Sequence, residues 1–343
     1  MKKTIILLFN AIVIVIILIT LSCPESSRSS GSDNGGRGGS SGNNTPIPGS
    51  LILINSHNPP GGSVYSVWGD GKYIYLAGAN SIHSYSVDSS GNLTHRDEDE
   101  NIGAFGIWGD RNYIYIANYN DGIYSYSVDS LSGKLTQIDS NDPGDYSYDV
   151  WGDGKYIYLA NSDGGIHSYS VNSSGYLILK YSDDPGYYVN GVWGDGKYIY
   201  LANANGGILS YSVDNSSGKL THIDSDDSLY GYAVTVWGDG NYIYLAHSGG
   251  GISSYSVDDL GDLTPIDSHY PGSNGVAIWA DANYIYLGCN DGGIHSYSVD
   301  DSGNLTPIDS HNPPGDYSYD IWGDKNFIYL ANGDGGLHVY KIE

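Results

Sequence analysis

The chain has 343 residues and a formal net charge of −25 at pH 7, and after residue 50 its only arginines are Arg96 and Arg111. Because a nucleic-acid partner requires Lys and Arg to neutralise its phosphates, this composition excludes nucleic acid and favours cations, cationic proteins or neutral ligands such as sugars. The two cysteines, Cys23 and Cys289, exclude a disulfide framework.

The N-terminus has the features of an export signal. Lys2 and Lys3 precede an almost wholly apolar run over residues 4–22, and Cys23 follows it. Residues 20–23, Thr-Leu-Ser-Cys, resemble a bacterial lipoprotein signal, which implies that residues 1–23 are a signal peptide region with Cys23 lipidated. The alternative is an uncleaved membrane anchor, because the apolar run approaches the length that spans a bilayer. Both place the rest of the chain outside the cytoplasm, in the cell envelope.

Residues 24–50 are rich in Ser, Gly and Asn. This composition predicts a flexible linker between the membrane and the remainder of the chain.

A repeat of about 42 residues fills residues 51–343. Each tryptophan is followed by Gly or Ala and then Asp, and an aromatic-Ile-Tyr-aliphatic run comes next. Two further runs, of the types Ile-x-Ser-Tyr-Ser-Val and Leu-Thr-x-Ile-Asp-Ser, are separated by Gly/Asn/Asp turns. The tryptophans are Trp68, Trp108, Trp151, Trp193, Trp237, Trp279 and Trp322.

Four short β-rich runs per repeat, with no helical periodicity after residue 50, predict an all-β fold: a seven-bladed β-propeller of four-stranded blades. We name the strands of each blade A to D, with A ending at the tryptophan. The last repeat lacks strand D at the C-terminus, but residues 51–61 match residues 305–315. The N-terminal strand is therefore expected to complete the last blade, which closes the ring and removes its exposed edges. We expect this body to be monomeric.

The runs Tyr-Ile-Tyr-Leu-Ala-Asn, Gly-Gly-Ile-His-Ser-Tyr-Ser-Val and Gly-Asn-Leu-Thr resemble repeats of the bacterial lactonase-like seven-bladed propellers, which include relatives of 6-phosphogluconolactonase and YVTN-type surface propellers. The resemblance covers residues 51–343 at the level of blade pattern. It implies the fold and allows a sugar-lactone hydrolase, but it transfers no catalytic residue to this chain.

The residue two positions before each tryptophan lies on the innermost strand, so this column is expected to line the central channel. Its members are Ser66, Gly106, Asp149, Gly191, Thr235, Ala277 and Asp320. Asp149 and Asp320 are the charged exceptions. The D–A and B–C loops beside them carry further aromatic residues, and the candidate ligand-binding set comprises Asp149, Asp320, Tyr65, Tyr146, Tyr148, Tyr317 and Tyr319. Rigid rings with polar tips suit a binding face.

Other polar columns are expected to be structural. The Asp after each Trp-Gly suits a hairpin turn. The residues that follow Ser in strand D, among them His57, His269 and His311, lie on the outermost strand and are too widely spread to share one metal ion. We therefore predict no metal cofactor. The loops at residues 161–165 and 332–336 contain oxygen ligands near glycine and leave Ca²⁺ open as an alternative.

The preferred functional hypothesis is a binding module that presents its D–A/B–C face to an envelope glycan or protein. The alternatives are a lactonase-like hydrolase that uses Asp149 or Asp320 at the channel mouth, and a purely structural surface repeat.

Overall fold

The structure is a computed structural model that describes residues 47–110, 112–227, 231–281, 283–291, 293–315 and 317–342. The predicted signal or anchor, Cys23 and residues 24–46 of the predicted linker lie outside the described residues. No described helix is long and apolar enough to cross a membrane. Pro46–Glu343 is one compact unit.

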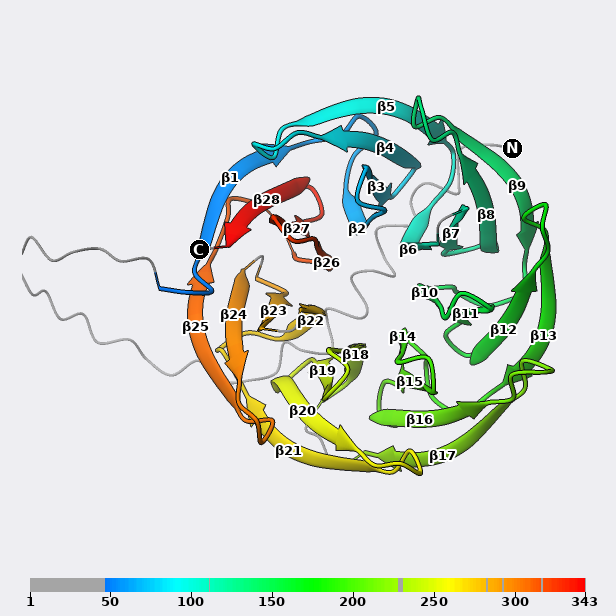
Figure 1. The fold of residues 1–343 in the computed structure, drawn as a ribbon, viewed down its shortest axis with the longest axis vertical. Coiled ribbons are helices and arrows are strands. Elements are labelled where there is room, and N and C mark those ends of the chain that lie inside the picture. Colours follow the sequence, from blue (N-terminus) through cyan, green and yellow to red (C-terminus); the bar gives the residue numbers. More distant parts are fainter. Residues whose placement is uncertain are drawn as a thin grey trace, which may run out of the picture. The chain divides into compact units, whose positions relative to one another are not determined.

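This unit is a seven-bladed β-propeller, as predicted, with seven four-stranded antiparallel sheets arranged around an axis (Figure 1). Blade 1 consists of β2 (Val64–Gly69), β3 (Tyr73–Gly78), β4 (Ser81–Val87) and β5 (Leu93–Glu100). Blade 2 consists of β6 (Ala104–Gly109), β7 (Tyr113–Asn118), β8 (Gly122–Val128) and β9 (Leu135–Asn141). Blade 3 consists of β10 (Asp149–Gly152), β11 (Tyr156–Ala160), β12 (Ile166–Val171) and β13 (Leu177–Asp183).

The remaining blades repeat this order. Blade 4 consists of β14 (Gly191–Gly194), β15 (Tyr198–Ala202), β16 (Ile208–Val213) and β17 (Leu220–Asp226). Blade 5 consists of β18 (Ala233–Gly238), β19 (Ile243–His247), β20 (Gly251–Val257) and β21 (Leu263–His269). Blade 6 consists of β22 (Gly275–Ala280), β23 (Tyr284–Cys289), β24 (Ile294–Val299) and β25 (Leu305–His311). Blade 7 consists of β26 (Asp320–Gly323), β27 (Phe327–Ala331), β28 (Leu337–Ile342) and β1 (Leu51–His57).

The N-terminal strand closes the ring, which confirms the prediction. β1 pairs antiparallel with β28, from Leu51 opposite Ile342 to His57 opposite Leu337. Figure 1 shows β1 on the outer rim beside β28. Strand B of each blade lies between two other sheets, and every residue of β11 and β15 is buried. This explains why both faces of these strands are apolar or aromatic.

A serine on strand C joins each of six successive blade pairs. Its hydroxyl donates over 2.6–2.8 Å to the carbonyl of the glycine that precedes strand D of the next blade, which lies in the C–D turn of blades 2 to 6 and before β1 in blade 7. Blade 7 has Val339 at this position, and the closing seam uses a different donor: Asn55 Nδ2 on β1 donates to Gly91 O over 3.1 Å.

The residue that follows Ser in strand D, which is His, Asp or Asn, contributes to packing between blades. The hydroxyls of Tyr126, Tyr169 and Tyr211 each donate over 3.0 Å to Asp99, Asn141 and Asp183 of the preceding blade. His269 and His311 contact the hydroxyls of Tyr297 and Tyr340 in the same way. The predicted structural role of this column is confirmed for these members.

We predict that Asn55→Ala lowers the free energy of unfolding by about 1 kcal/mol, because it leaves Gly91 O without its donor at the closing seam. Thr94→Ala, an exposed change on the adjacent β5, is the control and should alter stability by no more than about 0.5 kcal/mol. Urea denaturation measures both. Equal effects of the two changes would show that the Asn55 bond contributes nothing to closure.

Candidate functional site

The tryptophans form a collar around the channel at the rim that carries the A–B turns. Successive indole centroids from Trp68 to Trp237 are separated by 5.9–6.3 Å. Each indole lies over the Gly that follows the tryptophan of the next blade: a Cβ added at Gly152 would lie 2.6 Å from the ring of Trp108. Glycine is needed at this position because a side chain would occupy the space of the neighbouring indole.

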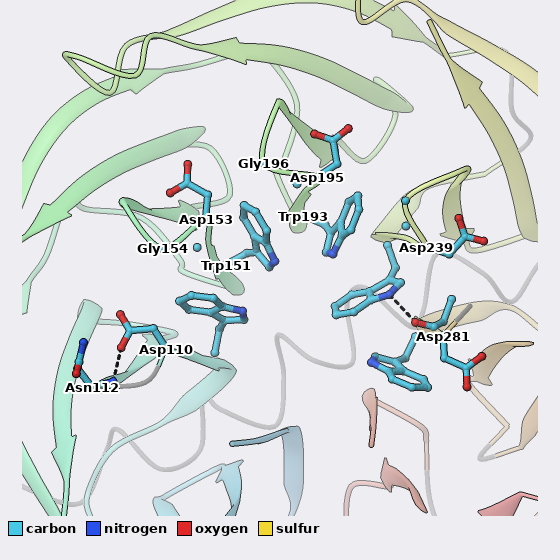
Figure 2. Close-up of a pocket in the computed structure, with 18 residues that line it drawn as sticks. Asp110, Asn112, Trp151, Asp153, Gly154, Trp193, Asp195, Gly196, Asp239 and Asp281 are labelled. Carbon is cyan, nitrogen blue, oxygen red and sulfur yellow. Dashed lines mark hydrogen bonds between the residues drawn. The ribbon is translucent and has the colours of Figure 1, made fainter. Parts of the chain in front are cut away.

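Ala280, which follows Trp279, is the one residue other than glycine at this position. Trp237, whose indole would lie over residue 280, instead donates its Nε1–H to the carbonyl of Ala280 over 3.2 Å. Figure 2 draws this bond as a dashed line at the edge of the collar. One methyl group thus gives one indole a different contact from those of its neighbours.

The aspartates of the A–B turns hold the collar in place, as blade 3 illustrates. Trp151 stacks on Tyr158 with centroids 6.0 Å apart, and the Tyr158 hydroxyl donates to Asp153 Oδ2 over 2.8 Å. The backbone N–H groups of Lys155 and Tyr156 donate to Asp153 Oδ1. The turn role predicted for this aspartate is confirmed, and it extends to supporting the tyrosine under the indole.

The collar encloses a hollow of about 850 Å³. Indoles from five blades and the Gly and Asp residues of their turns line it; the indoles are those of Trp108, Trp151, Trp193, Trp237 and Trp279. In Figure 2 the rings of Trp151 and Trp193 face the middle of the hollow, and the carboxylates of Asp153 and Asp195 lie outward of them. The size falls within the range of small-ligand sites.

Asp149 and Asp320 lie two residues before the collar tryptophans on β10 and β26, so they sit about 7 Å further along the channel. Each carboxylate bridges two blades. Asp149 Oδ1 accepts from the Val150 N–H over 2.8 Å, and its Oδ2 accepts from the Val192 N–H of the next blade over 3.0 Å. Besides lying on the innermost strand, as predicted, Asp149 therefore links backbone N–H groups of two neighbouring blades.

Asp320 makes the equivalent bridge between blades 7 and 1. Its Oδ1 accepts from the Ile321 N–H over 2.8 Å, and its Oδ2 accepts from the Ser66 hydroxyl over 2.6 Å and the Val67 N–H over 3.0 Å. The preceding blades have Ala277 and Gly106 at this position, neither of which offers a side-chain acceptor to Ile321 or Val150.

Both acids are half-buried and have no counter-charge among the described residues. Removal from water, with a smaller contribution from the charge of Asp320, raises the pKa of Asp149 to about 7 despite the hydrogen bond from the Val192 N–H. Removal from water raises the pKa of Asp320 to about 6, partly offset by the hydrogen bond from Ser66. A carboxylate that is partly removed from water without a cation is costly, so both acids would gain from a cationic ligand.

The opposite rim carries the predicted tyrosines, and most of them do meet. Tyr65 packs against Tyr319 at 4.8 Å, and Tyr119 packs against Tyr146 at 4.4 Å and Tyr148 at 5.6 Å. Phe105 joins the two groups through Tyr65 at 4.7 Å and Tyr119 at 4.8 Å. We call this the tyrosine arc.

Phe105 and Tyr119 were not among the predicted binding residues, although both belong to the arc. Tyr317 is partly exposed in the loop before β26.

Blade 4 contains a second hollow, of about 330 Å³, on the same rim as the arc. Asn203 lines it, is 1% exposed, and has an Oδ1 with no partner. In blade 3 the equivalent Asn161 Oδ1 accepts from Ser147 over 2.7 Å. Val189 stands at the serine position in blade 4, which leaves the Asn203 oxygen without a donor.

The edge of this second hollow is formed by Tyr187, which is 59% exposed and has a φ of 92°. The equivalent Asp145 has a φ of 59°, so the turn requires left-handed backbone at this position. A tyrosine there is strained, and such strain often accompanies function.

The predicted Ca²⁺ loops have internal uses for their side chains. Besides its bond from Ser147, Asn161 donates from Nδ2 to Gly144 O. Gly333 in the second loop bridges to Val64 through a pair of backbone hydrogen bonds. These contacts stabilise the rim without requiring an ion.

Comparison with known proteins bears on the fold. No family model matches the sequence, and no curated protein matches it. A proposed 6-phosphogluconolactonase from Bacteroides uniformis is similar in structure, with a TM-score of 0.70, 15% identity, and coverage of 76% of this chain and 87% of that chain. The WD40 β-propeller domain of Doa1 has a TM-score of 0.66 at 12% identity, covering 86% and 98%. The computationally designed Ika8 protein has a TM-score of 0.58 at 12% identity, covering 86% and 100%.

These likenesses support the propeller fold, while membership of the lactonase-like or YVTN-type group stays a prediction. The hollow itself is a site that sequence reasoning missed. In the sequence the tryptophans were used only to define the repeat, and no binding role was predicted for them. Their regular position before a small residue nevertheless indicated that each indole packs against a neighbouring blade.

The two channel acids should destabilise the fold as they ionise. A carboxyl whose pKa is raised in the folded state stabilises the fold below its unfolded pKa, near 3.8, and this contribution is lost as the pH rises through 6 and 7. Buried His57, His83, His167, His295 and His338 have lowered pKa values and act in the opposite sense.

The difference between wild type and the Asp149→Asn/Asp320→Asn variant isolates the acids from the histidines. We predict that this variant gains stability relative to wild type by up to about 4 kcal/mol between pH 5 and pH 8, since pKa values of about 7 and 6 lie about two and one pH units above pH 5, and one unit corresponds to about 1.4 kcal/mol. Chemical denaturation at both pH values measures it. A difference that does not change with pH would refute the raised pKa values.

Proposed function

We propose that the protein is a binding module of the cell envelope, tethered by its N-terminus, which holds a cationic segment of a protein partner in the tryptophan collar. The observation that carries this proposal is a hollow lined by indoles, above two half-buried acids that have no counter-charge among the described residues. The proposal follows from the chemistry of these groups.

A lysine or arginine side chain matches both parts of the site. Tryptophan offers the strongest cation–π interaction of the aromatic residues, worth about 2 kcal/mol or more when the cation is desolvated. Ionised Asp149 and Asp320 would supply opposite charge from within the channel. The formal net charge of −25 steers cationic partners toward the protein and repels anionic ones.

The test is calorimetric titration of the full chain with a lysine-rich peptide, beside acidic and neutral peptides of equal length. We predict that only the lysine-rich peptide binds, and that binding strengthens from pH 5.5 to pH 8 because ionisation of Asp149 and Asp320 adds attraction. The Asp149→Asn/Asp320→Asn variant should lose at least about 1.4 kcal/mol of binding energy, a tenfold change in affinity.

A matched control separates the channel from general electrostatics. Asp142→Asn/Asp184→Asn removes the same charge at exposed turns of the opposite rim, where each carboxylate accepts one backbone N–H that an Asn side chain also accepts. This variant should bind the peptide within about twofold of wild type apart from screening effects. Equal losses in the two double variants would mean that net charge, not the collar, drives binding.

A glycan is the second candidate ligand, favoured by the hollow in blade 4. A sugar could place its C–H face on Tyr187 and direct hydroxyls to the Asn203 amide and Asp227, which also line the hollow. Val189→Ser would give Asn203 the donor that Ser147 gives Asn161, so it should weaken sugar binding. Calorimetric titration of wild type and this variant with neutral sugars tests the glycan site. Peptide binding at the collar should be the same in both proteins.

The hydrolase alternative has one supporting observation: the pKa of Asp149 is close to the value that suits a general acid or base. Both oxygens of Asp149, however, already accept backbone N–H groups from strands β10 and β14. This arrangement favours a structural and electrostatic role for the acid over proton transfer. The purely structural alternative requires that the Asp149/Asp320 variant change no ligand interaction.

A further inference from the structure

Blade 1 carries two histidines and a glutamate on its outer strands that the other blades do not combine. His83 lies on β4, and His95 and Glu98 lie on β5. His83 Nδ1 is 3.4 Å from His95 Nε2 and 3.5 Å from Glu98 Oε2, and His95 Nε2 is 3.6 Å from Glu98 Oε2. Within the described part of the chain this is the one such group of His, Cys, Asp or Glu whose ligand atoms converge.

These three separations fit a tetrahedral metal centre. With bonds of about 2.0–2.1 Å, two ligands of tetrahedral zinc lie about 3.4 Å apart. We propose that His83, His95 and Glu98 bind a divalent transition metal, with Zn²⁺ the first candidate. Two imidazoles and one carboxylate form a donor set typical of zinc, and three protein ligands leave the fourth position open to water or another ligand.

The surroundings of His83 favour this role. Its Nε2 is 2.8 Å from the hydroxyl of Ser81, which fixes the ring and directs the lone pair of Nδ1 toward the other two ligands. The His83 ring is 3% exposed, whereas His95 and Glu98 are 40% and 36% exposed, so the metal has an approach from solvent.

Comparison between blades shows that this arrangement is particular to blade 1. In blades 3 and 7 the equivalent histidines, His167 and His338, contact serines of strand D through Nδ1 at 2.6 Å and 2.7 Å. Glu98 replaces that serine in blade 1.

Two further positions differ in the same blade. His95 occupies the position of Gln137 in blade 2, and Ser81 occupies that of Gly165 in blade 3, as the strand registers show. Blade 4 also has a histidine, His222, at the position of His95, but Glu98 and Ser81 occur in blade 1 alone, and both contact His83.

The packing beside His95 adds a second observation. Tyr85 contacts the ring of His95 at 5.2 Å and that of His57 at 4.8 Å. The Tyr85 hydroxyl and His57 Nε2 are buried atoms with no hydrogen-bond partner. Polar groups of this kind are rare in folded proteins, and the ring of Tyr85 packs directly on that of the proposed ligand His95.

This site is separate from the tryptophan collar and does not depend on the proposed function. It also departs from the expectation of no metal cofactor, which rested on the wide spread of the residues that follow serine in strand D. In the cluster, Glu98 occupies the position of that serine, and His83 lies opposite it on the neighbouring strand. Because the two residues are brought together by strand pairing, the cluster is not visible in the linear sequence.

The test is Zn²⁺ binding to the full chain after treatment with a chelator, with Co²⁺ as a spectroscopic probe. We predict one tightly bound Zn²⁺ per chain, a rise in melting temperature on adding the metal, and the intense visible absorption of tetrahedral Co²⁺. Glu98→Ser and His95→Gln install the residues that other blades use at these positions, so both should fold. Each removes a ligand and should weaken binding by about 100-fold or more, and Ser81→Gly should weaken it by about tenfold.

His222→Gln in blade 4 is the matched control. His222 occupies the position of His95, but Leu209 and Ser225 occupy the positions of His83 and Glu98 in this blade, so binding should remain as in wild type. The proposal is overturned if wild type binds no stoichiometric Zn²⁺, or if Glu98→Ser and His95→Gln bind it as tightly as wild type does.

Discussion

The contact between each indole and the glycine of the next blade governs the rest of this structure. It sets the approach of neighbouring A strands around the channel, since a single Cβ at that position already redirects Trp237 to the Ala280 carbonyl. With the strands at this separation, an acid at position 149 or 320 reaches an N–H group of the next blade. The hollow and the half-buried acids beside it therefore depend on one packing contact that is repeated around the ring.

Contacts that recur between successive blades hold the ring together, and departures from the repeat introduce the groups that could bind a ligand. The serine-to-glycine bonds and the aspartate-held turns recur from blade to blade. Asp149 and Asp320 place uncompensated charge in the channel, Val189 leaves Asn203 without a donor, and Glu98 replaces a serine beside His83. A propeller tolerates such changes because neighbouring blades continue to support the altered one.

The fold was predictable from sequence because tryptophan spacing and the match of residues 51–61 to residues 305–315 are properties of the linear chain. The channel position of Asp149 and Asp320 followed from their place on strand A. Their partners did not, because Val192 and Val67 belong to other blades. Phe105 was missed as the link in the tyrosine arc, and His95 was missed because its neighbour His83 is identified only by cross-strand register.

Tryptophan fluorescence tests the central claim most directly, because all seven tryptophans of the chain hold the collar position. Titration of the full chain with a lysine-rich peptide should change the emission in a saturable way at pH 8. The change should be smaller at pH 5.5 and be lost in the Asp149→Asn/Asp320→Asn variant. Unaltered emission while the peptide binds, or an equal change in the variant, would place the partner elsewhere and contradict the collar as a binding site.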